Sequence, residues 1–67
     1  MKNNFRIKDT NNGNMVIGEF TDNSNSIEQA LLTLSANKYI ILNNGLVLNV
    51  KALPRKFKLE KVGETNG

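Results

Sequence analysis

The sequence predicts a small α+β domain with the element order β-β-α-β-β-β, in which one helix packs on one face of a mainly antiparallel sheet. Two N-N-G triplets, at 11–13 and 43–45, lie between apolar or alternating segments, and Asn-Gly in that setting is a strong hairpin signal. Between the triplets, residues 26–36 have the apolar spacing of an amphipathic helix. The alternative is a small open barrel with the helix as a plug.

The length and composition predict one domain that needs reinforcement. We expect residues 1–62 to form this domain and residues 63–67 to be a disordered tail. The chain has no Cys and no His, so we expect no disulfide, no metal and no other cofactor. A chain of this size buries only about 60% of its unfolded surface. Self-association or a protein partner is therefore the expected source of further stability.

The first hairpin is predicted by residue pairs that fall into register together. Counting outward from a type I′ turn at 12–13, Phe5 faces Phe20 and Arg6 faces Glu19. Such an aromatic pair and such an ion pair each stabilise a sheet by about 0.2–1 kcal/mol. Gly18 should leave room for the helix to approach. The predicted core-facing residues are Phe5, Ile7, Val16 and Phe20.

The helix is expected at 26–36. Ser26 with Gln29 fits a capping box, and Asn25 with Glu28 is the alternative one residue earlier. Asn37 is expected in the left-handed conformation that ends many helices. The apolar face consists of Ile27, Ala30, Leu31 and Leu34.

The second hairpin, residues 38–51, is apolar on both faces. A type I′ turn at 44–45 would place Tyr39, Ile41, Leu46, Leu48 and Val50 on one side, which we expect to face the core. Ile40, Leu42 and Val47 would line the other side, joined by Ile17 and Met15. If these aliphatic side chains stayed in water, the domain would forgo about 1.5–3 kcal/mol for each. We therefore expect either a curled sheet or another chain to cover Ile40, Leu42, Val47 and Ile17.

The last third of the chain is basic. Pro54 ends a strand or lies in a loop, and 56–61 alternates as a strand with Phe57 and Leu59 inward. Net charge is +3, which permits an anionic partner without requiring one. The alternative function is therefore nucleic-acid binding through Lys51, Arg55, Lys56, Lys58 and Lys61. The expected lack of exposed aromatic rings beside these residues counts against it.

Catalysis is not expected, because the usual acid–base and nucleophilic groups are missing. The carboxylates are scattered, and Asp9 and Asp22 lie beside a turn and a cap, where they have structural roles. We expect a non-enzymatic protein-binding or regulatory module that acts by self-association or by inhibiting a host protein. Twelve asparagines are typical of AT-rich genomes, such as those of low-GC bacteria and their phages. With no apolar leader and no membrane-spanning run, a cytoplasmic location is expected.

Overall fold

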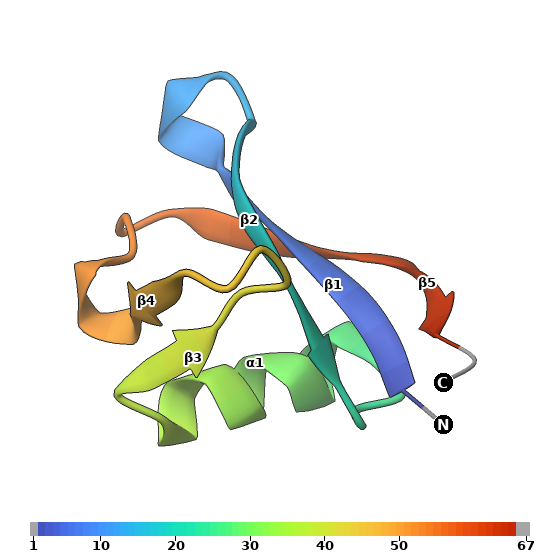
Figure 1. Cartoon of the computed structure of the whole chain (residues 1–67). Helices are drawn as coiled ribbons and strands as arrows, with labels where there is room; N and C mark the ends of the chain where they lie inside the picture. The colour runs from blue at the N-terminus through green and yellow to red at the C-terminus, as the bar shows by residue number, and fades with distance from the viewer. Residues whose placement is uncertain (1, 66–67) are drawn as a thin grey trace.

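The computed structural model describes residues 2–65 and confirms the α+β class and the predicted element order. Strands β1 (Lys2–Asp9), β2 (Met15–Asp22) and β5 (Phe57–Thr65) form an antiparallel sheet in the order β2-β1-β5. Strands β3 (Tyr39–Ile41) and β4 (Val47–Asn49) form a second, two-stranded sheet. Both sheets are open, so the chain does not adopt the barrel considered as the alternative (Figure 1).

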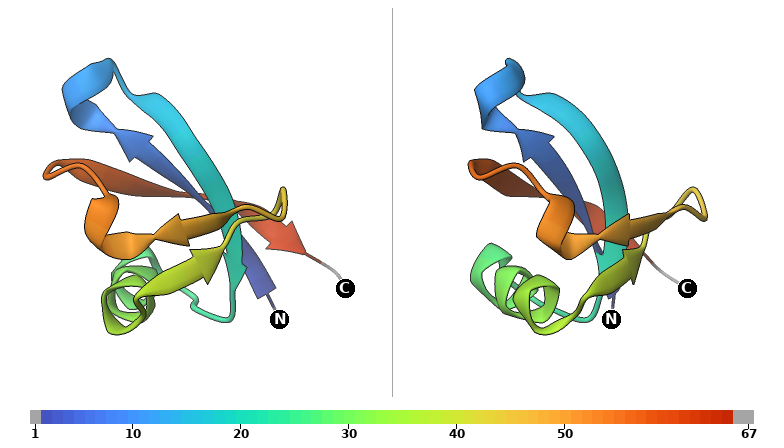
Figure 2. Two further views of the ribbon diagram at one scale, coloured as in Figure 1. Left: turned by 60° about the vertical axis from the view of Figure 1, so that its left-hand side comes forward. Right: turned by 90° about the vertical axis from the view of Figure 1, so that its left-hand side faces the viewer.

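The helix and the second hairpin share one face of the three-stranded sheet. Helix α1 (Ile27–Ala36) and the β3–β4 hairpin lie side by side against that face (Figures 1 and 2). Two short 3₁₀ turns, η1 (Thr10–Asn12) and η2 (Val50–Ala52), follow β1 and β4. The buried apolar core comes from all these layers and consists of Phe5, Ile7, Phe20, Ala30, Leu34, Leu42 and Leu59.

The predicted register of the first hairpin is confirmed next to the core. Phe5 pairs with Phe20, Arg6 with Glu19 and Ile7 with Gly18. The rings of Phe5 and Phe20 stack with their centroids 5.7 Å apart. The centre of the sheet is therefore built from the residue pairs that the sequence predicted.

The predicted type I′ turn of the first hairpin is wrong. The connection contains η1, and the positive φ angles fall at Gly13 (64°) and Asn14 (61°). The register shifts after Ile7, so that Lys8 pairs with Val16, and this bulge absorbs the extra residue of the longer loop. Val16 consequently lies on the side of Lys8 and is 50% exposed, not in the core as predicted.

Gly18 makes room for the second hairpin and not for the helix. A Cβ atom at Gly18 would lie 2.7 Å from Cδ1 of Leu42, closer than two carbon atoms can approach without a clash. Leu42 is buried at 6% exposure. The missing side chain of Gly18 therefore lets the tip of the β3–β4 hairpin pack directly on β2.

The helix forms where the sequence predicted it. Ser26 is the N-cap, and its Oγ accepts a hydrogen bond from the Gln29 N–H at 3.2 Å, so Ser26 and not Asn25 caps the helix. The Gln29 Oε1 atom accepts from the Asn25 N–H at 2.8 Å. Asn37 is extended (φ −115°), not left-handed as predicted. Its Nδ2 donates to the Thr33 carbonyl at 2.7 Å, which satisfies a helix-end acceptor without a positive φ.

The last strand is longer than predicted. Leu59 is buried and Phe57 packs against the core, as expected from the alternation. However, β5 continues to Thr65, which pairs with Lys2. Residues 63–65 therefore belong to the strand and not to the predicted disordered tail, and residues 66–67 lie outside the described part of the chain.

We predict that Gly18→Ala destabilises the domain, because the new methyl group displaces Leu42 from its position on β2. Overpacking of this kind costs about 1–3 kcal/mol, measurable as a lower free energy of unfolding in urea. Gly63→Ala is the matched control in a strand, since a Cβ atom there has nothing within 4 Å. Equal unfolding free energies for the two variants would contradict the packing role of Gly18.

Candidate functional site

The β3–β4 hairpin has a three-residue loop and not the predicted two-residue turn. Tyr39 pairs with Asn49, and Ile41 pairs with Val47, one residue away from the predicted register. The Gly45 N–H donates to the Leu42 carbonyl at 2.9 Å, and Gly45 has φ 89°. This is the pattern of a β-turn followed by one left-handed residue, in which only the glycine needs a positive φ.

This one-residue shift exchanges the two faces of β3. Leu42 is buried and Ile40 is half-buried against the core, so these two residues do not form the exposed patch that the sequence predicted. Ile17 is also half-buried against the core. Of the predicted partner-binding residues, Val47 is the one that is exposed, at 64%.

The residues on the opposite face of β3 are exposed instead. Tyr39 is 60% exposed and Ile41 is 71% exposed, although both were expected to face the core. Ile41 and Val47 face each other across the strands. We call Tyr39, Ile41 and Val47 the outer face of the hairpin. Leu46, which bonds to Leu42 at the tip, is also exposed, at 63%.

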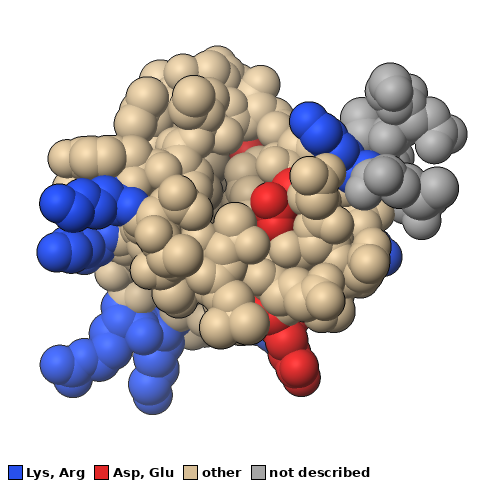
Figure 3. All heavy atoms as spheres, turned by 90° about the horizontal axis from the view of Figure 1, so that it is seen from below, with Lys and Arg blue, Asp and Glu red and all other residues tan. Residues whose placement is uncertain are grey.

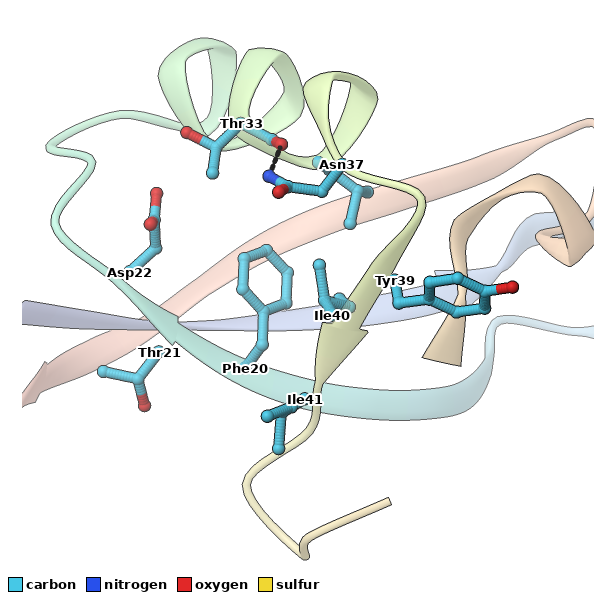
Figure 4. A pocket seen from close by; sticks show the side chains of 9 residues that line it. Phe20, Thr21, Asp22, Thr33, Asn37, Tyr39, Ile40 and Ile41 are labelled. Atoms are coloured by element: carbon cyan, nitrogen blue, oxygen red, sulfur yellow. Dashed lines mark hydrogen bonds between the residues drawn. The ribbon is translucent and has the colours of Figure 1, made fainter. Parts of the chain in front are cut away.

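A pocket of about 320 Å³ lies beside this outer face, between β2, α1 and β3. Phe20 and Ile40 lie in the middle of the pocket, whereas the Tyr39 ring points away from them (Figure 4). The volume of the pocket is at the small end of the range for ligand-binding pockets. The lining residues are Phe20, Thr21, Asp22, Thr33, Leu34, Asn37, Tyr39, Ile40 and Ile41.

Asn43 attaches the hairpin tip to the edge of β2. Its backbone N–H donates to the Glu19 carbonyl at 2.8 Å. The Asn43 side chain makes two further hydrogen bonds. Its Oδ1 accepts from the Thr21 Oγ1 at 2.9 Å, and its Nδ2 donates to the Asn4 Oδ1 at 3.3 Å. The tip is therefore held by polar contacts on one side and by Leu42 over Gly18 on the other.

The predicted basic stripe is divided between different surfaces. Lys58 lies opposite Lys8 on the outward face of the three-stranded sheet, and the Lys61 Nζ points to the Asn25 carbonyl at 3.5 Å. Lysine and arginine side chains gather on the side where η2 and the start of β5 lie (Figure 3). From η2 to the residue before β5, the exposed basic residues are Lys51, Arg55 and Lys56.

An ion-pair ladder crosses the outward face of the three-stranded sheet. Arg6 contacts Glu19 at 3.1 Å and Glu60 at 3.2 Å, and Lys8 contacts Glu60 at 2.9 Å. The hydrogen bond from Lys8, followed by the charges of Lys8, Arg6 and Lys58, lowers the pKa of Glu60. Glu19 and Glu60 offset the charges of Arg6 and Lys8 on this face, which makes it a weaker surface for an anionic partner than an unpaired basic patch.

Asp9 and Asp22 have structural partners. Asp9 Oδ1 accepts from the Asn11 N–H at 3.0 Å, and Asp22 Oδ2 accepts from the Ser24 N–H at 3.3 Å, which is the turn and cap role expected for both. Within residues 2–65, no group of three acidic side chains is placed to hold a metal ion. No helix in this range is long and apolar enough to cross a bilayer.

We predict that Glu60→Gln lowers stability in a pH-dependent way. Because the folded-state pKa of Glu60 is lowered, its contribution is present above the unfolded carboxyl pKa and is lost as the pH falls through the folded pKa. Urea unfolding of both proteins from pH 7 down to about pH 2 should show the difference shrinking. In a Lys8→Gln background the effect of Glu60→Gln should be smaller. A difference that stays constant with pH would contradict the role of this ion pair.

Comparison of the chain with protein-family models, with curated proteins and with solved structures finds no significant match.

Proposed function

We propose that this domain is a protein-binding module and that the outer face of the β3–β4 hairpin is its interface. The observation that carries the proposal is the exposure of Tyr39, Ile41 and Val47 side by side on one sheet face, with Leu46 at the tip. Aromatic side chains are enriched at protein interfaces. The partner is either a second copy of the chain or another protein, such as a host protein that the module inhibits.

The proposal is supported by the cost of leaving this face in water. Full burial of an aliphatic side chain is worth about 1.5–3 kcal/mol, and a domain of this size has only a few kcal/mol of net stability. Leu32 on α1 is 72% exposed, but single exposed apolar residues are common and need no partner. Three adjacent residues on a sheet face form a patch, and patches are typical of binding sites.

Substitution of the outer face tests this proposal. We predict that Ile41→Lys lowers partner affinity by about tenfold or more, as expected for a central interface residue. Leu32→Lys is the matched control, because Leu32 and Ile41 are equally exposed, at 72% and 71%. The measurement is retention of proteins from a lysate of the encoding organism on the immobilised domain, with light scattering to detect self-association. Unchanged retention by Ile41→Lys together with a strictly monomeric wild type would contradict the proposal.

Single-stranded nucleic acid is the second candidate partner, and the exposed Tyr39 favours it. Tyr39 follows Lys38, and the Val50 N–H donates to the Lys38 carbonyl at 2.9 Å, which brings Lys51 close to Lys38. An aromatic ring among basic residues is the arrangement on which single-strand binders stack bases. The chain offers one such ring here, whereas the apolar outer face offers three adjacent residues, so protein binding is the better-supported function.

For this second candidate we predict salt-sensitive binding of a fluorescent single-stranded oligonucleotide, followed by anisotropy. Lys51→Glu should reduce the slope of log affinity against log salt concentration by the equivalent of about one phosphate contact or more. Tyr39→Ala should cost about 1–3 kcal/mol of binding free energy. Lys61→Glu is the control with the same charge change, since Lys61 points to the Asn25 carbonyl instead. Absence of binding at low salt would exclude this candidate.

A further inference from the structure

The edge of β3 that faces away from β4 has free backbone groups. In an antiparallel pair, alternate residues direct both N–H and C=O to the partner strand, and the residues between them direct these groups to the opposite edge. The Leu42 N–H donates to the Leu46 carbonyl at 2.8 Å, and the Val50 N–H donates to the Lys38 carbonyl. Tyr39 and Ile41 therefore direct N–H and C=O away from β4, where no described strand pairs with them.

The edge of β2 that faces away from β1 is also largely free. The Glu19 carbonyl accepts from the Asn43 N–H, so Glu19 points to this outer edge. By the same alternation Thr21 does so as well, and its backbone groups have no strand partner among residues 2–65. Two strand edges with free backbone groups thus begin where Asn43 bonds to the Glu19 carbonyl and to the Thr21 side chain.

The two edges diverge from that contact and leave a wedge between them. In Figure 1, β3 and the end of β2 separate as they run towards α1. The pocket of about 320 Å³ occupies this wedge and is lined by Thr21 of one edge and by Tyr39 and Ile41 of the other. Its middle is apolar, with Phe20 and Ile40 (Figure 4). The wedge thus combines backbone donors and acceptors with space for an apolar side chain.

The charge at the open end of β3 indicates what kind of segment fits. Lys38 precedes β3 and lies close to Lys51, and both are exposed. The described ion pairs use Arg6 and Lys8 as their cations, so the charges of Lys38 and Lys51 are available to a partner. Acidic residues at one end of a bound segment would complement them.

We infer that the wedge between β2 and β3 binds an extended segment of a partner protein by strand addition to the free edge of β3. Backbone hydrogen bonds at Tyr39 and Ile41 supply affinity, and an apolar side chain in the pocket supplies specificity. Acidic residues of the segment lie next to Lys38. This inference rests on the proposed protein-binding function and names the conformation and chemistry of the partner segment.

The experiment uses three synthetic peptides of about eight residues that alternate threonine with valine, leucine or phenylalanine and end in two glutamates. Each is added to the ¹⁵N-labelled full chain, and amide hydrogen exchange is followed by NMR. At least one peptide should slow the exchange of the Tyr39 and Ile41 amides by about tenfold. The same peptide with N-methyl groups on its interior residues should have no effect, because strand pairing needs its N–H groups.

Two substitutions of Ile41 distinguish binding through its backbone N–H from binding through its apolar side chain. Ile41→Thr and Ile41→Pro both remove the apolar side chain, but only proline removes the outward N–H, and proline is tolerated on a strand edge. Peptide protection of the Tyr39 amide should persist in Ile41→Thr and disappear in Ile41→Pro. Unchanged amide resonances of Phe5 and Phe20 would show that both variants keep the core.

The remaining outcomes overturn the inference in distinguishable ways. If the peptide protected only the Leu46 and Val47 amides, the outer face would be a binding surface without strand addition. The same would follow if Ile41→Thr and Ile41→Pro lost the protection of the Tyr39 amide equally. Protection of Tyr39 and Ile41 that appears with protein concentration alone would place a second copy in the wedge. If no peptide protects these amides, while Ile41→Lys still abolishes partner retention, strand addition is excluded and the proposed function stands.

Discussion

The contact between Leu42 and Gly18 determines how the second hairpin is placed. Leu42 occupies the space that a side chain at position 18 would fill, and the next residue, Asn43, bonds to the edge of β2. The backbone of the hairpin therefore bonds to β2 at its tip. Because β3 and β2 diverge from this point, the pocket opens between them. The face of the hairpin opposite Leu42 and Ile40 is left facing solvent.

Residues 2–65 supply no further layer that covers that face. Helix α1 and the hairpin already share the apolar face of the three-stranded sheet, and the other face of this sheet carries the charged ladder of Arg6, Glu19, Lys8 and Glu60. A small domain can enclose only one core. In the described residues, a hairpin that is apolar on both faces can therefore bury one face internally, and the other is available to a partner.

The elements that were predicted correctly from the sequence are those in which one face differs clearly from the other. The helix has a single apolar stripe and a polar cap, and β5 alternates between basic residues and the inward-facing Phe57 and Leu59. The sequence predicted that Ile40 and Leu42 are exposed on the second hairpin, but the structure exposes the opposite face of β3. An N-N-G triplet is compatible with a two-residue turn and with a three-residue loop, and these differ by one residue in register. That single residue exchanges inside and outside along the whole strand.

The same error in turn type had different consequences in the two hairpins, because their strands differ in patterning. In the first hairpin, stacking of Phe5 on Phe20 holds the register at the core, and a bulge between that pair and the loop absorbs the extra residue. In the second hairpin both faces of β3 are apolar, so a slip by one residue still places aliphatic side chains inside. No core pair in the sequence selects one register over the other. Because both faces of β3 are apolar, the sequence does not specify the register of this hairpin. For the same reason, apolar side chains remain on the surface once Ile40 and Leu42 are buried, namely those of Tyr39, Ile41 and Val47.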